Sequence, residues 1–216
     1  MNEPELTGAL QGLEPLTASH LTRYKSAVSE SGALGWGYYF PYLLARGKAG
    51  RSVVLVGEDS DTLCLYQWER GETSDKLELI VPPIPFDHDV LKRCLERANE
   101  FNGDRKARIL RVDEQDADTV ADHPGLKVRQ RRAQYLFAPA NYEDLSGRRL
   151  RTVRRQVAAF EELEGIAIRP MEASDRDACH ALLREWKRTH RDAHGTAGGA
   201  GTTGRGIDLL GTLPDR

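Results

Sequence analysis

Hydrophobic and polar residues recur with two different periods along the chain, and each period predicts a different kind of element. "RSVVLVGED" and "DTLCLYQWE" are apolar runs separated by a short acidic stretch, which is typical of a β-hairpin. "DHDVLKRCLERANEF" instead repeats its apolar residues at steps of three and four, which predicts a helix capped by Asp87. Its inner face would carry Val90, Leu91, Cys94, Leu95 and Ala98.

Weaker patterns fill the rest of the first 140 residues. Thr17 is a suitable N-cap for a helix in "LTASHLTRYKSAVSES", and the aromatic stretch "GALGWGYYFPYLLARG" favours an irregular or short helical segment. "KLELIVPPIPF", "ARILRVD" and "LKVRQRRAQYLFAP" predict strands, and "EQDADTVADHPG" predicts a short helix with a turn. This order of helices and strands predicts an α+β (mixed α/β) domain with a mixed central sheet flanked by helices.

A second unit is expected to begin with "YEDLSGRRLRTVRRQVAAFEELEG", a helix whose narrow apolar seam comprises Leu150, Val153, Val157 and Phe160. "IAIRPM" predicts a short strand. "DRDACHALLREWKRTHRD" predicts a helix whose buried face would hold Cys179, Leu182, Leu183 and Trp186. The glycine-rich "AHGTAGGAGTTGRG" has no such pattern and predicts a flexible segment. We therefore divide the chain into residues 1–140, 141–192 and 193–216.

Charge is distributed unevenly over a chain whose formal net charge is only −2. Nine Lys and Arg residues fall between residues 127 and 155, against two acidic residues, Glu143 and Asp144. This local excess suggests an anionic partner. The three cysteines are scattered without metal-ligand spacing, the N-terminus lacks the pattern of a signal peptide, and no apolar run is long enough to span a bilayer. We therefore expect a cytoplasmic protein.

The stretch from "QYLFAPANYEDLSGRRLRTVRRQVAAF" to "ALLREW" resembles the catalytic domain of the phosphatidylglycerol lysyltransferase family. The family signature combines a tyrosine, an "L.Gkkl" motif and a basic end with a phenylalanine. Here Tyr135 corresponds to the tyrosine, and the motif corresponds to Leu145, Gly147, Arg148, Arg149 and Leu150. Arg154, Arg155 and Phe160 correspond to the end of the signature. Gln134 and the pair Gln156–Val157 depart from it.

The resemblance implies a tandem pair of acetyltransferase-like (GNAT) domains, a first one over residues 1–140 and the start of a second one after the basic helix. It implies transfer of an aminoacyl group from aminoacyl-tRNA to an acceptor such as the headgroup of an anionic phospholipid, at a peripheral position on the inner membrane surface. The later motifs of the second domain are missing, so we expect an incomplete second domain. The alternatives are a non-catalytic interaction module and a degenerate fragment, either of which would bind an anionic partner through the basic helix.

The candidate substrate-binding residues are Arg148, Arg149, Arg151, Arg154, Arg155 and Tyr135. Guanidinium groups spaced by three and four residues share a helix face and bind phosphate in a bidentate manner. The same residues would equally form a solvated basic face between two domains. The sequence indicates no general base.

Other candidate sites are weaker. Acyl-CoA binding needs backbone amides at a helix N-terminus, whereas "IVPPIPFDHD" offers three prolines, two aspartates and no glycine. We therefore expect no cofactor. His190 and His194 share a helix face but lack a third ligand, so we expect no metal. The cluster of Trp36, Tyr38, Tyr39, Phe40 and Tyr42 is expected to be mainly core, with lipid docking as the alternative.

Overall fold

The computed structural model describes residues 8–47, 52–103, 106–131, 143, 145–194, 200–210 and 212. These residues belong to two compact units, one formed by residues 1–128 with 172–216 and the other by residues 129–171. Each unit is described by itself below.

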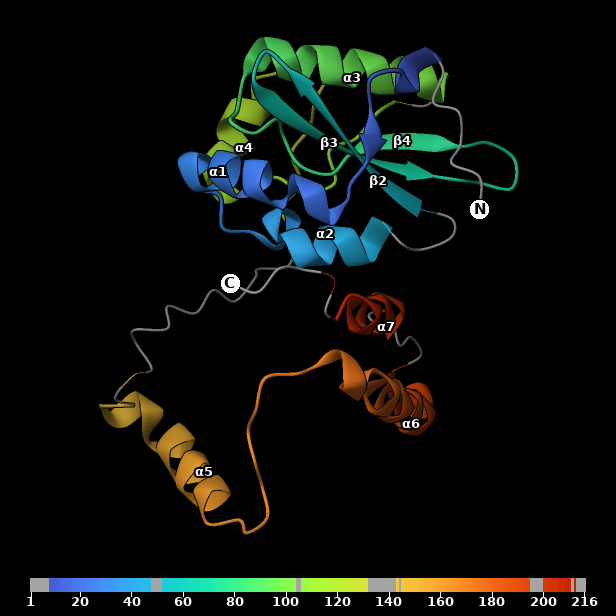
Figure 1. Ribbon diagram of the computed structural model, residues 1–216. Helices are drawn as coiled ribbons and strands as arrows, with labels where there is room; N and C mark the ends of the chain where they lie inside the picture. Colours follow the sequence, from blue (N-terminus) through green and yellow to red (C-terminus); the bar gives the residue numbers. More distant parts are fainter. Residues whose placement is uncertain are drawn as a thin grey trace. The chain divides into compact units, whose positions relative to one another are not determined.

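The centre of the first unit is a four-stranded antiparallel sheet in the order β1-β2-β3-β4 (Figure 1). Its strands are β1 (Glu14–Pro15), β2 (Ser52–Asp59), β3 (Thr62–Glu69) and β4 (Lys76–Leu79). The predicted hairpin is confirmed as β2 and β3, which pair from Ser52 opposite Glu69 to Asp59 opposite Thr62. Ser60 and Asp61 both have positive φ angles, as a two-residue hairpin turn of this twist requires.

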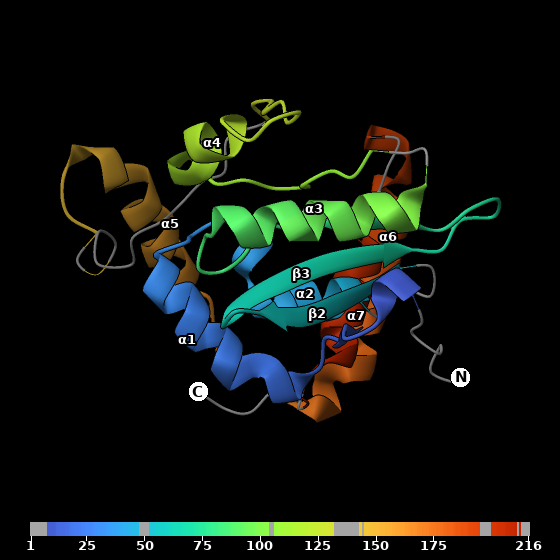
Figure 2. The same ribbon diagram turned by 90° about the horizontal axis from the view of Figure 1, so that it is seen from above.

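Helices cover both faces of this sheet (Figure 1, Figure 2). One face packs against α3 (His88–Asn102), with Leu55, Tyr66, Leu77 and Leu91 in the shared core. The other face packs against α1 (Leu21–Ser31) and α2 (Phe40–Gly47). Successive side chains of a strand point to opposite faces, so β3 contributes to both cores. The mixed α+β class predicted from the sequence is confirmed.

The helix α3 agrees with its predicted pattern in detail. The Asp87 side chain accepts a hydrogen bond of 2.8 Å from the Val90 amide, which satisfies one of the unpaired donors of the first turn. All five predicted inward residues are buried. The helix α4 (Glu114–Ala121) also lies where the sequence predicts a short helix.

Short 3-10 helices precede several of these elements. They are η1 (Gly8–Leu10), η2 (Ala18–His20), η3 (Trp36–Tyr38), η5 (Arg148–Leu150) and η6 (Ala173–Asp175). Thr17 is the N-cap of η2, which leads directly into α1. Pro41 lies in the first turn of α2, where a missing amide hydrogen costs no hydrogen bond.

The aromatic cluster is divided between core and surface. Tyr38 and Phe40 are buried, as predicted, whereas Tyr42 is half-buried. Trp36 and Tyr39 are exposed, with their rings in edge contact 5.7 Å apart. Successive residues of a 3-10 turn such as η3 point in three different directions, so this segment contributes to both the core and the surface.

Three of the predicted strands are not formed within the described residues. The segment "ARILRVD" makes only an isolated parallel bridge, between Ile109 and Leu79. Residues 126–131 and 166–171 contain no strand. A strand is stable only beside a hydrogen-bonding neighbour, and no strand is described in the second unit to pair with "IAIRPM".

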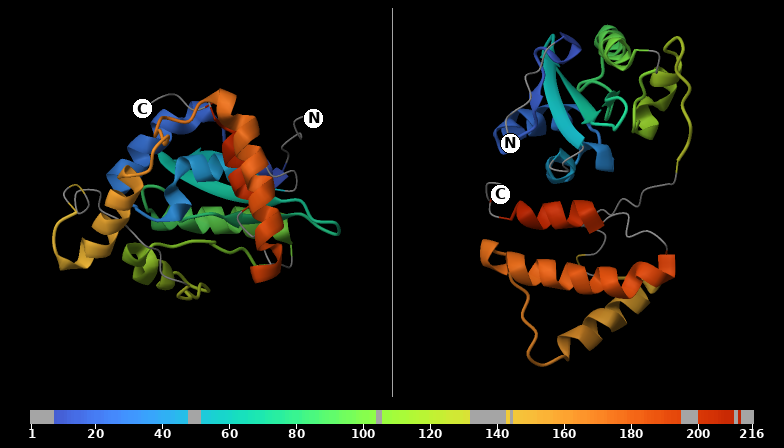
Figure 3. Two further views of the ribbon diagram at one scale, coloured as in Figure 1. Left: turned by 90° about the horizontal axis from the view of Figure 1, so that it is seen from below. Right: turned by 90° about the vertical axis from the view of Figure 1, so that its right-hand side faces the viewer.

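The C-terminal helices also differ from expectation. In α6 (Arg176–His194) Leu182 and Trp186, predicted to be buried, are 71% and 41% exposed. Residues 200–208, predicted to be flexible, form α7 (Ala200–Asp208), which packs against α2 (Figure 3). The Arg205 Nε atom donates to the Ala45 carbonyl, and Leu209 is 6% exposed in the α1–α2 core. Tertiary contacts therefore stabilise a helix whose sequence alone does not favour it.

Glu78 is a buried carboxylate on the sheet, and its charge is balanced by two cations. Its Oε1 atom lies 2.6 Å from Lys76 Nζ and 2.5 Å from Arg108 Nε. Burial alone would raise the pKa of Glu78, but the hydrogen bonds and charges of Arg108 and Lys76 outweigh it and lower the pKa. The ionised form is therefore favoured in the folded protein.

We expect Glu78→Gln to lower the free energy of unfolding at pH 7 by about 1–2 kcal/mol, because two charge-assisted hydrogen bonds become neutral ones. A lowered folded pKa contributes stability above the unfolded pKa of about 4.3, and this contribution is lost as pH falls through the folded value. Urea unfolding at pH 7 and pH 3 should therefore show the difference between wild type and variant shrinking in acid. A difference that stays constant with pH would contradict this assignment.

Candidate functional site

The second unit contains the basic helix that the sequence singled out. The 3-10 turn η5 leads into α5 (Arg151–Glu161). Gly147 precedes this turn with a φ of 80°, a backbone conformation that glycine adopts without steric cost. The Arg154 Nη1 atom points back along the helix and donates to the carbonyls of Leu145 and, at 2.8 Å, Gly147. Arg154 thus fixes the turn that begins the helix, which is a structural role.

The other four arginines of this segment differ from Arg154 in their contacts. Arg148, Arg149, Arg151 and Arg155 are exposed, and within the described residues none of them forms an ion pair with a carboxylate. Residues 148, 151 and 155 are spaced by three and four, so they lie on one side. Like charges at this spacing repel each other, and an anionic partner would relieve that repulsion. We call these four residues the arginine surface.

An apolar stripe accompanies the arginine surface along the same helix. Val157 and Phe160 are exposed, whereas Leu150 and Val153 are half-buried. The predicted seam is therefore present as a pattern, but the described residues of the second unit leave much of it uncovered.

Several predicted residues fall outside the described part of the chain. Tyr135, the signature tyrosine, is one of them, and Arg132 and Gln134 are others. Arg129 and Arg131 are described and exposed, but they lie on an irregular segment, so strand alternation does not apply to them. The backbones of His190 and His194 belong to α6, and their side chains are not described.

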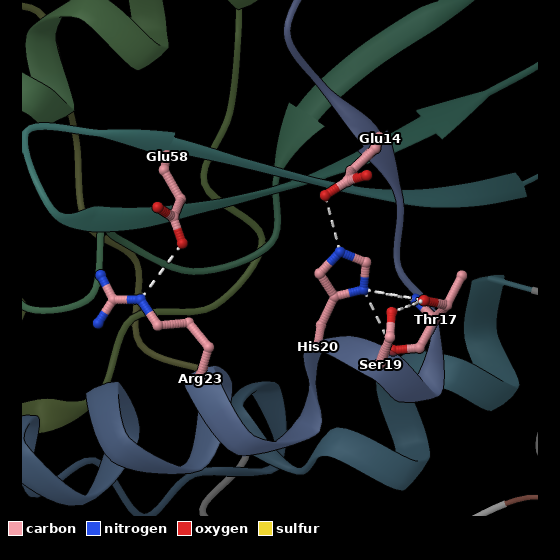
Figure 4. Close-up of polar contacts among 6 residues, drawn as sticks. All are labelled: Glu14, Thr17, Ser19, His20, Arg23 and Glu58. Atoms are coloured by element: carbon pink, nitrogen blue, oxygen red, sulfur yellow. Dashed lines mark hydrogen bonds and ion pairs between the residues drawn. The ribbon is translucent and has the colours of Figure 1, made fainter.

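A separate pocket of about 310 Å³, with both charged and apolar residues in its wall, lies in the first unit. It is bounded by β1, the end of β2, η2 and the start of α1 (Figure 4). Glu14 pairs with Val56 across the two strands, and Glu58 follows Val56 by two residues. Cross-strand partners and alternate residues share a sheet face, so both carboxylates lie on the face that α1 covers.

One side of this pocket is an imidazole–carboxylate pair. The His20 Nε2 atom lies 2.9 Å from Glu14 Oε1, and its Nδ1 atom lies 3.0 Å from the Thr17 amide nitrogen (Figure 4). An amide N–H is always a donor, so Nδ1 accepts and the neutral ring carries its hydrogen on Nε2. Both ring nitrogens are occupied. The ring therefore positions Glu14 and has no lone pair left to serve as a general base.

The other side is a guanidinium–carboxylate pair from α1 and β2. The Arg23 Nε atom donates to Glu58 Oε1 at 3.2 Å, and Nη2 donates to the Asp61 carbonyl at 2.7 Å. Tyr24 also lines the pocket, and it is 2% exposed. Within the described residues its hydroxyl has no hydrogen-bond partner. Burial raises the pKa of Tyr24, so the phenol stays protonated.

Sequence reasoning did not identify this pocket. Its charged residues Glu14, Arg23 and Glu58 come from β1, α1 and β2. The sequence predicts the strand that contains Glu58 and the helix that contains Arg23, but not that β1 pairs with β2. The alternation that places Glu14 and Glu58 on one face becomes visible once the pairing of β1 with β2 is known.

Two further observations concern metals and membranes. Among the described residues, no three His, Cys, Asp or Glu side chains converge as metal ligands do. Within the same residues, no helix has the length and apolar character needed to cross a bilayer.

Comparison with known protein families identified a match over most of the chain. The family model described as "Phosphatidylglycerol lysyltransferase, C-terminal" matches residues 47–209, which include α5, α6 and the glycine-rich segment that we expected to be a tail. No curated protein and no solved structure matched significantly. The matched residues make up well over half of the chain and contain the whole arginine surface. The chain therefore belongs to the phosphatidylglycerol lysyltransferase C-terminal family.

Proposed function

We propose that this chain acts in aminoacyl transfer, with an aminoacyl-tRNA as the donor and an amine or hydroxyl group, such as that of an anionic lipid headgroup, as the acceptor. The arginine surface would bind the phosphates of the donor or of the lipid. Family membership supports the reaction class. The observation that carries the binding role is the set of four exposed arginines without acidic partners among the described residues.

The chemistry of such a transfer makes modest demands on side chains. The aminoacyl ester of a tRNA is already activated, so the protein has to hold the ester near its acceptor and stabilise the oxyanion that develops. Arginine suits the first task because its planar fork binds two phosphate oxygens at once. The groups that would stabilise the oxyanion are left unassigned. The proposal also includes a GNAT-like arrangement of the domains.

The alternative function is a non-catalytic module that binds an anionic partner through the same arginines. The feature that favours it is the uncovered apolar stripe next to the arginine surface, because a helix with basic and apolar sides is typical of binding segments. Both proposed functions include binding of an anionic partner by the arginine surface, but only the first includes transfer of an aminoacyl group.

The binding role is tested by reversing Arg151 and Arg155 to glutamate in the full chain. We expect the Kd for a fluorescently labelled tRNA to rise by at least about tenfold at about 0.1 M salt, with the salt slope of log K reduced by about 2. A matched control, Lys25→Glu with Lys92→Glu, changes the net charge equally at exposed positions of α1 and α3. Equal losses in both double variants would show a general charge effect and contradict the proposed surface.

The reaction is tested separately. Lysyl-tRNA with a labelled amino acid is incubated with the wild-type chain and vesicles of phosphatidylglycerol, and label in the lipid fraction is counted. Transfer that is lost in the Arg151/Arg155 variant supports the enzyme. Intact tRNA binding without transfer to any acceptor supports the non-catalytic module.

A further inference from the structure

We propose that Tyr42, Arg46 and Arg111 form a binding site for a phosphate monoester whose planar ring lies against Trp36. The site belongs to the first unit, and the proposal rests neither on aminoacyl transfer nor on the arginine surface. Trp36, Tyr42 and Arg46 precede residue 47, where the family match begins, so the family match does not account for the site.

The first observation is that two guanidinium groups share one neutral acceptor. Arg46 Nη1 donates to the Tyr42 hydroxyl at 3.0 Å, and Arg111 Nη2 donates to the same oxygen at 3.3 Å. Within the described residues neither guanidinium pairs with a carboxylate. Arg46 Nε donates to the Gln67 side-chain oxygen, and the Gln67 amide nitrogen donates in turn to Glu69. Two like charges on one oxygen repel each other, and an anion bound to both would relieve this repulsion.

The second observation is that both guanidiniums are held in place and still have donors to offer. Arg46 and Arg111 are half-buried. The Arg111 stem packs against Gly37, where an added Cβ would lie 3.0 Å from Arg111 Cδ, and the Arg111 amide donates to the Ile80 carbonyl at 3.0 Å. Among the described contacts Arg46 Nη2 and Arg111 Nη1 have no acceptor, and neither atom is fully buried, so both donors reach solvent. A ligand would therefore meet preorganised donors.

The third observation is the uncompensated charge around the Tyr42 hydroxyl. Burial alone would raise the pKa of Tyr42, but the charges and hydrogen bonds of Arg46 and Arg111 outweigh it and lower the pKa. A phosphate monoester carries a charge of about −1.5 to −2 at pH 7, which matches two guanidiniums beside a neutral phenol. The planar guanidinium fork also fits two phosphate oxygens at once. Charge and geometry together favour a phosphate monoester over a singly charged anion.

The fourth observation is an exposed aromatic surface next to the two cations. Trp36 is 52% exposed and Tyr39 is 48% exposed. The centroids of the Trp36 and Tyr42 rings lie 5.5 Å apart, and Arg111 Cζ lies 5.8 Å from the centroid of the Tyr42 ring. A planar ring on the ligand would bury apolar surface against Trp36 while the phosphate contacts the guanidiniums.

The probe for this site is phenyl phosphate, with phenyl sulfate and inorganic phosphate as comparisons. Phenyl sulfate has a similar shape but a single negative charge, and inorganic phosphate lacks the ring. In the full chain we expect saturable shifts of the side-chain Nε–H resonances of Arg46 and Arg111 and of the Trp36 indole N–H, with a Kd of roughly 0.1–1 mM. Phenyl sulfate and inorganic phosphate should each bind at least about fivefold more weakly.

Variants assign the binding to named groups. Arg46→Gln with Arg111→Gln keeps amide donors but removes both charges, and we expect the Kd for phenyl phosphate to rise at least about tenfold. Trp36→Leu should weaken binding of phenyl phosphate several-fold and leave inorganic phosphate unchanged. Arg23→Gln with Arg93→Gln is the matched control, because it removes two arginines that already pair with carboxylates, and it should leave the Kd unchanged.

Three results would overturn the proposal: no saturable shifts with phenyl phosphate, equally tight binding of phenyl sulfate, or an equal loss in the Arg23/Arg93 control. The Arg151/Arg155 variant of the tRNA experiment should bind phenyl phosphate like wild type. A loss of binding there would assign the anion to the arginine surface and would also overturn the proposal. A failure of the tRNA experiment does not affect these measurements, so the two proposals fail separately.

Discussion

Shortening Leu91 to alanine is expected to lower the free energy of unfolding by about 2–5 kcal/mol. Leu91 is 0% exposed in the core between α3 and the sheet, where it packs with Leu55, Tyr66 and Leu77. One methine and two methyl groups would be lost from this core. The strands behind them are held in register by β2–β3 pairing, so the cavity would close only partly. The measurement is urea unfolding followed by circular dichroism.

The control for this variant is Glu96→Ala on the exposed side of the same helix, which should change stability by less than about 0.5 kcal/mol. Alanine has the highest helix propensity, so neither substitution weakens the helix on that ground. A comparable loss in both variants would therefore show that the effect is not specific to the buried side of α3. A loss below about 1 kcal/mol for Leu91→Ala would contradict the assignment of α3 to the core.

Replacing Leu209 by alanine is expected to lower the free energy of unfolding by about 2–3 kcal/mol, near the lower end of the range for a buried leucine. Leu209 follows α7 directly and lies in the core formed by α1, α2 and the sheet. The loss of unfolding free energy should not exceed this range, because α7 contacts few other elements of the unit. If the shortened side chain let α7 detach, only the free energy of packing α7 against α2 would be lost.

Leu182→Ala on α6 is the matched control, because it makes the same change at a leucine that is 71% exposed. It should change stability by less than about 0.5 kcal/mol. A Leu209 variant as stable as this control would support the flexible tail that the glycine-rich sequence predicts. A clear loss would support α7 as part of the first unit.

The position of α7 also bears on how the C-terminal part is held. Arg176 Nη2 donates to the Leu210 carbonyl at 3.0 Å, and His180 Nε2 lies 2.7 Å from Asp208 Oδ1. These contacts join α6 to the end of α7, while Arg205 and Leu209 join α7 to the α2 side of the sheet. A helix poor in intrinsic propensity can persist when several such contacts act together.

Local patterns in the sequence were sufficient for the elements whose periodicity is strong. The β2–β3 hairpin, α3 with its Asp87 cap and five buried residues, and the basic helix α5 could each be predicted from a few neighbouring residues. Their signals are local, because alternation, capping and helical spacing depend on positions within one or two turns. The family resemblance of the basic segment could be recognised for the same reason, because it rests on a short local motif.

Predictions failed where an element depends on a distant partner. "IAIRPM" has the composition of a strand but no described neighbour to pair with, and "ARILRVD" makes a single bridge to β4. Leu182 and Trp186 follow a helical apolar pattern, yet nothing in the described structure covers them enough to bury them. A residue is buried only when another element covers it, and the apolar pattern of a helix describes the helix alone and not the element that covers it.

The sequence by itself determined the α+β class, the strong local elements and the concentration of arginines, because each depends on residue type and spacing alone. Tertiary structure decided which residues meet. It gave Arg154 a structural role at the helix start, brought the Cys64 and Cys94 sulfurs to 3.1 Å across β3 and α3, and placed Glu14 beside His20 and Glu58 beside Arg23 around one pocket. Those contacts arise from strand pairing and helix packing between residues far apart in the chain, which no local pattern encodes.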